Sequence, residues 1–165
     1  MRLSGITPES VVDGPGLRFV IFTQGCPHKC LYCHNPDSWA SNAGKEFTVK
    51  QVIRLLRQQN KSKRGITFSG GEPFLQAAEL TQVALAARQM NCDVVTYTGF
   101  TYEQLIEDGG SDIKALLFAS DILIDGKYIH ELRNIGLRFS GSSNQRVIDI
   151  AATLKYGQVV LWEGR

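Results

Sequence analysis

Three of the four cysteines in this sequence lie within a segment of eight residues. Cys26, Cys30 and Cys33 follow the spacing Cys-x3-Cys-x2-Cys, which allows three thiolates on one short loop to bind a single metal centre. Thiolates are soft ligands that favour zinc, copper(I) or iron–sulfur clusters. A structural zinc site needs a fourth protein ligand, whereas a [4Fe–4S] cluster held by three cysteines keeps one iron open for chemistry. The spacing favours the cluster, and structural zinc is the alternative.

Four predicted strands precede the residues that could do chemistry. The segments 17–23, 65–69, 92–97 and 121–125 are rich in β-branched and aromatic residues, as strands are. After these strands come, in turn, the cysteine loop, Gly70-Gly71-Glu72-Pro73, Thr98-Gly99 and Asp125-Gly126-Lys127. The carboxyl ends of parallel strands form the working face of α/β folds. We therefore expect these segments to meet at one edge of a sheet.

Amphipathic helices are expected between these strands. Thr48 and Gln51 have the spacing of a capping box before an apolar stripe, and Thr101 with Gln104 repeats it. Strands that alternate with helices predict an α/β fold with a mostly parallel sheet. A closed eightfold barrel needs about 250 residues, so this chain would supply roughly five or six βα units. The expected architecture is a partial, open barrel or a doubly wound sheet.

The last third of the sequence has weaker patterns. Further strands are predicted at 137–140 and 159–162, with helical spacing around 147–154. Because no linker or repeat interrupts the chain, we expect residues 1–165 to form a single domain.

Composition narrows the class of protein. Eighteen Lys and Arg against sixteen Asp and Glu give a net charge of +2, which argues against a dedicated nucleic-acid binder. No apolar run is long enough to span a membrane, and the first residues lack the apolar core of a signal peptide. A tight cysteine cluster is more typical of a cytosolic metal or redox site than of a secreted disulfide framework. The expected location is therefore the cytoplasm.

Two motifs together resemble the radical S-adenosylmethionine (SAM) superfamily. They are the segment from Cys26 to Asn35 and the segment from Ser69 to Pro73. The early Val12-Asp13-Gly14-Pro15-Gly16 and the late segment 141–147 narrow the resemblance to the activating proteins of anaerobic ribonucleoside-triphosphate reductase. The resemblance implies a partial, open (βα)5-6 barrel of the radical SAM type, with a [4Fe–4S] cluster and SAM as cofactors.

The resemblance also assigns roles to individual residues. Cys26, Cys30 and Cys33 match the ligands of three irons, and the fourth iron chelates the amino and carboxylate groups of SAM. Tyr32 would lie against the adenine, with the backbone near His34 completing that pocket. The remaining matches are Gly70 and Gly71, which would hold the methionine amino group, and Glu72, which would accept from that group or support the loop.

Other matches have structural alternatives. Asp125 and Lys127 resemble a strand-end pair that helps hold a cation near the SAM carboxylate, but the partner acid expected after the third strand is absent. A plain surface salt bridge between the two residues is the alternative. Ser142, Ser143, Asn144 and Arg146 would contact the ribose or carboxylate, or else form turns and caps. Cys92 is expected to be an inert buried thiol, and His130 has no assigned role.

The reaction implied by the resemblance is reductive cleavage of SAM. An external one-electron donor such as flavodoxin or ferredoxin would supply the electron. The resulting 5′-deoxyadenosyl radical would take a hydrogen from a glycine of the partner, the large subunit of anaerobic ribonucleotide reductase. Activation of another glycyl radical enzyme such as pyruvate formate-lyase is an alternative. A non-catalytic zinc-binding module is the alternative from another class.

Overall fold

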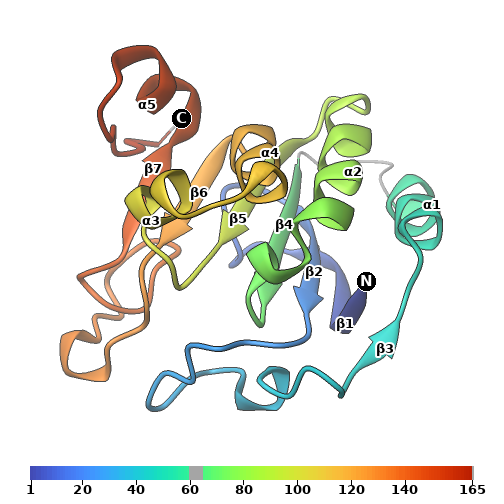
Figure 1. Ribbon diagram of the computed structural model, residues 1–165, viewed down its shortest axis with the longest axis horizontal. Helices are drawn as coiled ribbons and strands as arrows, with labels where there is room; N and C mark the ends of the chain where they lie inside the picture. Colours follow the sequence, from blue (N-terminus) through green and yellow to red (C-terminus); the bar gives the residue numbers. More distant parts are fainter. Residues whose placement is uncertain (60–64, 165) are drawn as a thin grey trace.

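The computed structural model describes residues 1–59 and 65–164 of the chain (Figure 1). In order, its elements are β1 (Arg2–Ser10), β2 (Arg18–Thr23), η1 (Pro36–Ser38), β3 (Lys45–Glu46), α1 (Val49–Gln59), β4 (Gly65–Gly70), η2 (Pro73–Gln76), α2 (Ala77–Arg88), β5 (Asp93–Tyr97), α3 (Tyr102–Glu107), α4 (Ser111–Ala119), β6 (Ile122–Asp125), η3 (His130–Leu132), β7 (Arg146–Asp149) and α5 (Ile150–Tyr156), where η marks a short 3-10 helix.

The described strands form one sheet in the order β3-β1-β2-β4-β5-β6-β7. The central strands β2, β4, β5 and β6 run parallel. At one edge β1 pairs antiparallel with β2 and with β3, and at the other edge β7 pairs antiparallel with β6. The four parallel strands are the four predicted from the sequence, so the mixed α/β fold with a parallel sheet is confirmed. Within the described residues four strands run parallel and β7 returns antiparallel to β6, so the expected five or six βα units of an open barrel stay a prediction.

The helices pack on one face of this sheet. Alternate strand residues such as Phe19, Ile21 and Phe68 share a core with the buried side chains of α1, α2 and α4. Val95 and Ile124 belong to a second, smaller core that includes parts of the C-terminal segment. The chain between β2 and β3 lies beyond the carboxyl ends of β2 and β4, at the bottom of Figure 1. That segment carries the three clustered cysteines.

Both predicted capping boxes are present. At α1, the Gln51 amide donates to Thr48 Oγ1 over 3.2 Å, and the Thr48 amide donates to Gln51 Oε1 over 2.8 Å. At α3, Thr101 and Gln104 make the same reciprocal pair of bonds. No described helix is long and apolar enough to cross a membrane.

The predictions for the last third are partly wrong. Residues 137–140 are irregular rather than a strand, and within 159–162 only Leu161 forms a bridge, to Ile148. Residues 146–149 form strand β7 where helical spacing was expected, and α5 begins only at Ile150. Because β7 has only four residues, an alternation of apolar and polar side chains cannot be recognised in its sequence. The helical spacing of apolar residues in α5 continues into these four residues, so the sequence pattern there is typical of a helix.

Candidate functional site

A cavity of about 480 Å³ lies at the carboxyl ends of the four parallel strands. All three clustered cysteines line it, which confirms that the sequence-distant motifs meet at one edge of the sheet. The wall also includes residues that come after each of the other parallel strands, namely Gly70 and Gly71 after β4, Thr98 and Gly99 after β5, and Gly126 and Lys127 after β6.

The cysteine loop presents three thiols to this cavity. Each is half-buried and none forms a disulfide. The loop turns tightly because Lys29 and Tyr32 adopt left-handed backbone angles, with φ of 48° and 57°. Burial raises the pKa of the Cys26 thiol, with Glu72 adding to the shift. A thiol with a raised pKa keeps its proton until a metal displaces it.

These donors fit an iron–sulfur cluster. Among the described residues, no three His, Cys, Asp or Glu side chains form a group that could hold one metal ion. A four-iron cluster does not require that convergence, because each cysteine binds a different iron. Three soft thiol donors lining one cavity are therefore a suitable ligand set for the cluster.

The Gly-Gly-Glu loop packs directly against the start of the cysteine loop. The Gly71 amide donates to the Thr23 carbonyl and the Glu72 amide to the Gly25 carbonyl, each over 2.8 Å. A Cβ on Gly71 would lie 2.3 Å from the Gly25 oxygen, and Gly70 has a φ of +92°. The two glycines are therefore required by close backbone approach as well as by conformation.

Gly71→Ala is expected to force the two loops apart. Because the obstructing atom is a backbone oxygen, we expect a loss of about 1–3 kcal/mol of unfolding free energy and weaker SAM binding. Thermal unfolding and equilibrium SAM binding would measure both effects. Gly5→Ala is the matched control, since a Cβ there meets nothing within 4 Å. Equal behaviour of the two variants would contradict the prediction.

Glu72 is fully buried and is not among the residues that line the cavity. Its Oε1 accepts from the Phe74 amide over 3.1 Å and from Thr98 Oγ1 over 3.0 Å. Its Oε2 accepts from the Gly99 amide over 2.9 Å and from His28 Nε2 over 2.8 Å. This geometry favours support of the surrounding loops over a contact with the SAM ammonium group.

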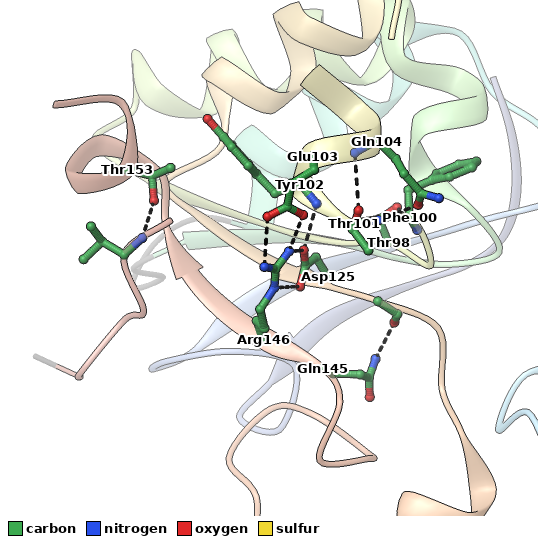
Figure 2. A network of polar contacts seen from close by, with 12 residues as sticks. Thr98, Phe100, Thr101, Tyr102, Glu103, Gln104, Asp125, Gln145, Arg146 and Thr153 are labelled. Carbon is green, nitrogen blue, oxygen red and sulfur yellow. Dashed lines mark hydrogen bonds and ion pairs between the residues drawn. The ribbon is translucent and has the colours of Figure 1, made fainter. Parts of the chain in front are cut away.

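Asp125 is buried and pairs with Arg146 (Figure 2). It accepts from Arg146 Nε over 3.0 Å, from Arg146 Nη2, and from the Tyr102 amide over 2.8 Å. Arg146 lies between this carboxylate and that of Glu103, to which it donates two further bonds. The alternative of a surface salt bridge between Asp125 and Lys127 is therefore wrong, because Asp125 is buried and Arg146 on β7 takes both carboxylate oxygens. Lys127 lines the cavity instead.

Because Arg146 binds Glu103, we expect the free energy of unfolding to fall at low pH. Hydrogen bonds from Arg146 lower the pKa of Glu103 to about 2. A lowered carboxyl pKa stabilises the fold above the pKa of the unfolded chain, and this contribution is lost as pH falls towards 2. Since the Glu103 side chain is 48% exposed, we expect a loss of about 1 kcal/mol or less. Denaturant unfolding between pH 5 and about 2 should show this loss in the wild type but not in Glu103→Gln. Glu107→Gln, exposed on the same helix, should behave like the wild type.

The late polar segment holds the loop after β6. Asn144 Nδ2 donates to the Lys127 carbonyl over 2.8 Å, and Gln145 Nε2 donates to the Gly126 carbonyl over 3.0 Å (Figure 2 draws the Gln145 contact). Ser142 is buried, and its hydroxyl accepts from the Ile129 amide over 3.2 Å. Ser142 and Asn144 are not among the lining residues, whereas Gln145 is. These contacts favour the turn-and-cap role for the segment.

An aromatic group lies between the cysteine loop and the chain after β6. Tyr32 is exposed, and its ring centroid lies 4.3 Å from that of His130. His34 lines the cavity and lies 5.5 Å from the ring of Tyr128, which lines it too. His130, which had no role in the sequence analysis, is therefore a neighbour of the residue predicted to lie against the adenine.

Sequence reasoning did not single out several polar residues of the cavity wall, among them Asp13, Tyr97, Tyr128 and Gln145. Ser10 Oγ donates to Asp13 Oδ2 over 2.5 Å. Burial raises the pKa of the Tyr97 phenol, and the charge of Asp13 adds to the shift. Tyr97 ends β5, so its position at the carboxyl end of a parallel strand was the signal that could have identified it.

Comparison with known proteins agrees with this geometry. The protein family described as "4Fe-4S single cluster domain" matches residues 12–148. The anaerobic ribonucleoside-triphosphate reductase-activating protein of Vibrio cholerae is 34% identical over 145 residues, or 84% of this chain and 91% of that protein. The protein of the same name from Salmonella typhi is 30% identical over 89% of this chain and 97% of its own length.

A longer relative also matches. The pyruvate formate-lyase 1-activating enzyme of Escherichia coli K12 is 36% identical over 98% of this chain, but the aligned part spans 65% of that enzyme. The crystal structure of QueE from Escherichia coli has a TM-score of 0.47 at 17% identity, covering 61% of this chain and 52% of that one.

The fold and the three-thiol cavity define a single-cluster 4Fe–4S protein. More specifically, the chain belongs to the radical SAM activating proteins of glycyl radical enzymes, whose cofactors are a [4Fe–4S] cluster and SAM.

Proposed function

We propose that this chain generates the glycyl radical of an anaerobic ribonucleoside-triphosphate reductase. The observation that carries the proposal is that Cys26, Cys30 and Cys33 line one cavity with Gly70 and Gly71 at the ends of parallel strands. The choice of partner is supported by the names of two relatives. The anaerobic ribonucleoside-triphosphate reductase-activating proteins of Vibrio cholerae and Salmonella typhi are 34% and 30% identical to this chain.

The residues of the cavity have separate roles in this proposal. When bound, the cluster and SAM supply one-electron chemistry that no side chain of the protein provides. The thiolates of Cys26, Cys30 and Cys33 would hold three irons. Backbone carbonyls at Gly70 and Gly71 would accept from the methionine ammonium group, and Lys127, which lines the cavity, would offer its positive charge to the methionine carboxylate.

Other residues shape and close the cavity. Tyr32 would lie against the adenine, since a flat ring stacks on a base without reading its identity, and the backbone near His34 would complete that pocket. Phe22 and Phe139 line the cavity and exclude water, which protects a radical from side reactions. Ser142 and Asn144 hold the loop that carries Lys127.

The open side of the fold and two protein partners also belong to the proposed function. All helices that share the main core lie on one face, as in a partial, open barrel whose inner face ends at the cavity. Its open side would admit a flexible glycine loop of the reductase large subunit. A cytoplasmic one-electron donor of the flavodoxin or ferredoxin class would supply the electron.

Anaerobic metal analysis with electron paramagnetic resonance (EPR) tests the cofactors. We expect about four irons and matching sulfide per chain, and a reduced-cluster signal that changes when SAM is added. Stoichiometric zinc with no response to SAM would overturn the proposal in favour of a structural metal module.

A second experiment tests the partner. The reduced protein with SAM should produce a glycyl radical EPR signal on anaerobic ribonucleoside-triphosphate reductase and none on pyruvate formate-lyase. A signal on pyruvate formate-lyase alone would reverse the assignment of the partner.

A further inference from the structure

His28 lies between Cys26 and Cys30 in the sequence. Its ring does not pack within the cysteine loop but contacts residues of two other loops. The side chain is only 6% exposed. It occupies a slot formed by Glu72, Gly99 and Phe100, which belong to the loops after β4 and β5. We refer to these three residues as the His28 slot.

The contacts within the slot are close on every side. His28 Nε2 donates to Glu72 Oε2 over 2.8 Å, and the ring meets Phe100 edge-on with centroids 4.6 Å apart. A Cβ on Gly99 would lie 2.3 Å from His28 Cδ2, so the ring fills the space that a side chain at position 99 would need. Gly99 has no positive φ, and the three atoms nearest to a Cβ at this position all belong to the His28 ring.

Glu72 explains why a donor is needed in this slot. Each of its carboxylate oxygens accepts two hydrogen bonds, and His28 supplies one of the four. A buried carboxylate that loses a donor keeps its desolvation cost without compensation. The cysteine loop therefore contributes a bond that the loop after β4 requires.

The slot connects the loops that line the cavity. Gly71, Thr98 and Gly99 all line the cavity. The Gly126 amide, in the loop after β6, donates to the Phe100 carbonyl over 2.9 Å. Moving His28 would thus change the position of the cysteines relative to the other three loops.

We infer that His28 is a positioning residue that fixes the cysteine loop, through Glu72, Gly99 and Phe100, at the distance from the glycine loop that SAM must bridge. The inference rests on the proposed function for the role of the cavity. The contacts within the slot are properties of the protein itself and can be tested without cofactors.

A double-mutant cycle on the full-length, metal-free chain tests the slot. His28→Ala should lower the melting temperature by roughly 4–10 °C, because Glu72 loses a donor in a chain of this size. Gly99→Ala should cost roughly 4 °C or more in the wild type, since its methyl group meets the ring, but about 1 °C or less in the His28→Ala background. His130→Ala removes an exposed histidine and should shift the melting temperature by about 1 °C or less.

The reconstituted protein tests the positioning role. His28→Ala should retain the iron content of the wild type but bind SAM at least about tenfold more weakly, a cost of the size expected for an orienting residue near a metal site. The SAM-induced change of the EPR spectrum should shrink accordingly. His28→Gln, which restores a donor to Glu72, should recover part of the SAM affinity.

The two readouts separate the inference from the proposed function. Additive effects of His28→Ala and Gly99→Ala on the melting temperature, or wild-type SAM affinity in His28→Ala, would overturn the positioning role while leaving the activase proposal intact. A wild-type chain that binds no cluster and no SAM would overturn the proposed function, while the cycle would still decide whether the slot exists.

Discussion

Replacing Cys30 with alanine is expected to abolish SAM cleavage. Each of the three clustered thiols would bind a different iron, so loss of one leaves the cluster with two protein ligands. Removing even a hydrogen-bonding neighbour of a metal ligand costs about 10–100-fold, so loss of a ligand should cost more than about 100-fold. Iron content, the reduced EPR signal and the yield of 5′-deoxyadenosine would measure the effect. Cys26→Ala and Cys33→Ala should behave in the same way.

Cys92→Ala is the matched control. Cys92 is buried just before β5 and does not line the cavity. Its loss should leave iron content and SAM cleavage unchanged and cost about 1–2 kcal/mol of unfolding free energy through lost packing. Full activity in Cys30→Ala, or loss of iron in Cys92→Ala, would mean that the cluster is bound elsewhere.

The parts of the site that sequence predicted are those with local signals. The cysteine spacing, the four parallel strands and both capping boxes depend on residues a few positions apart. The rule that parallel strands expose their carboxyl ends at one edge then brought the motifs together without any knowledge of their contacts. The cavity wall confirms that step.

The parts that sequence did not predict depend on contacts between distant residues. Asp125 and Arg146 are 21 residues apart, and their pairing requires β7 to return antiparallel beside β6. His28 and Glu72 are 44 residues apart, and nothing in either motif indicates that one side chain supports the other. Helix α4 was not predicted, because Gly110 precedes it and offers no side chain that would mark its start as a cap.

Arg146→Met is expected to destabilise the fold strongly. Asp125 is 1% exposed, and Arg146 supplies two of its three hydrogen bonds. Removing one partner of a buried pair costs about 3–5 kcal/mol because the other charge is left buried alone. Since the Arg146 side chain is 32% exposed, water can reach part of the pair, and we expect about 2–4 kcal/mol in denaturant unfolding at neutral pH.

The matched control is Arg88→Met, which breaks the pair of Arg88 with Asp121. Those side chains are 43% and 35% exposed, so the loss should be about 1 kcal/mol or less. Adding Asp125→Asn to Arg146→Met removes the stranded charge and should restore part of the lost stability. If Arg146→Met and Arg88→Met lost a similar amount of unfolding free energy, Asp125 would be hydrated in solution. In that case the loop from Gly126 to Lys127 would be held by Asn144, Gln145 and the Phe100 carbonyl without help from Arg146, and SAM binding would survive the loss of Arg146.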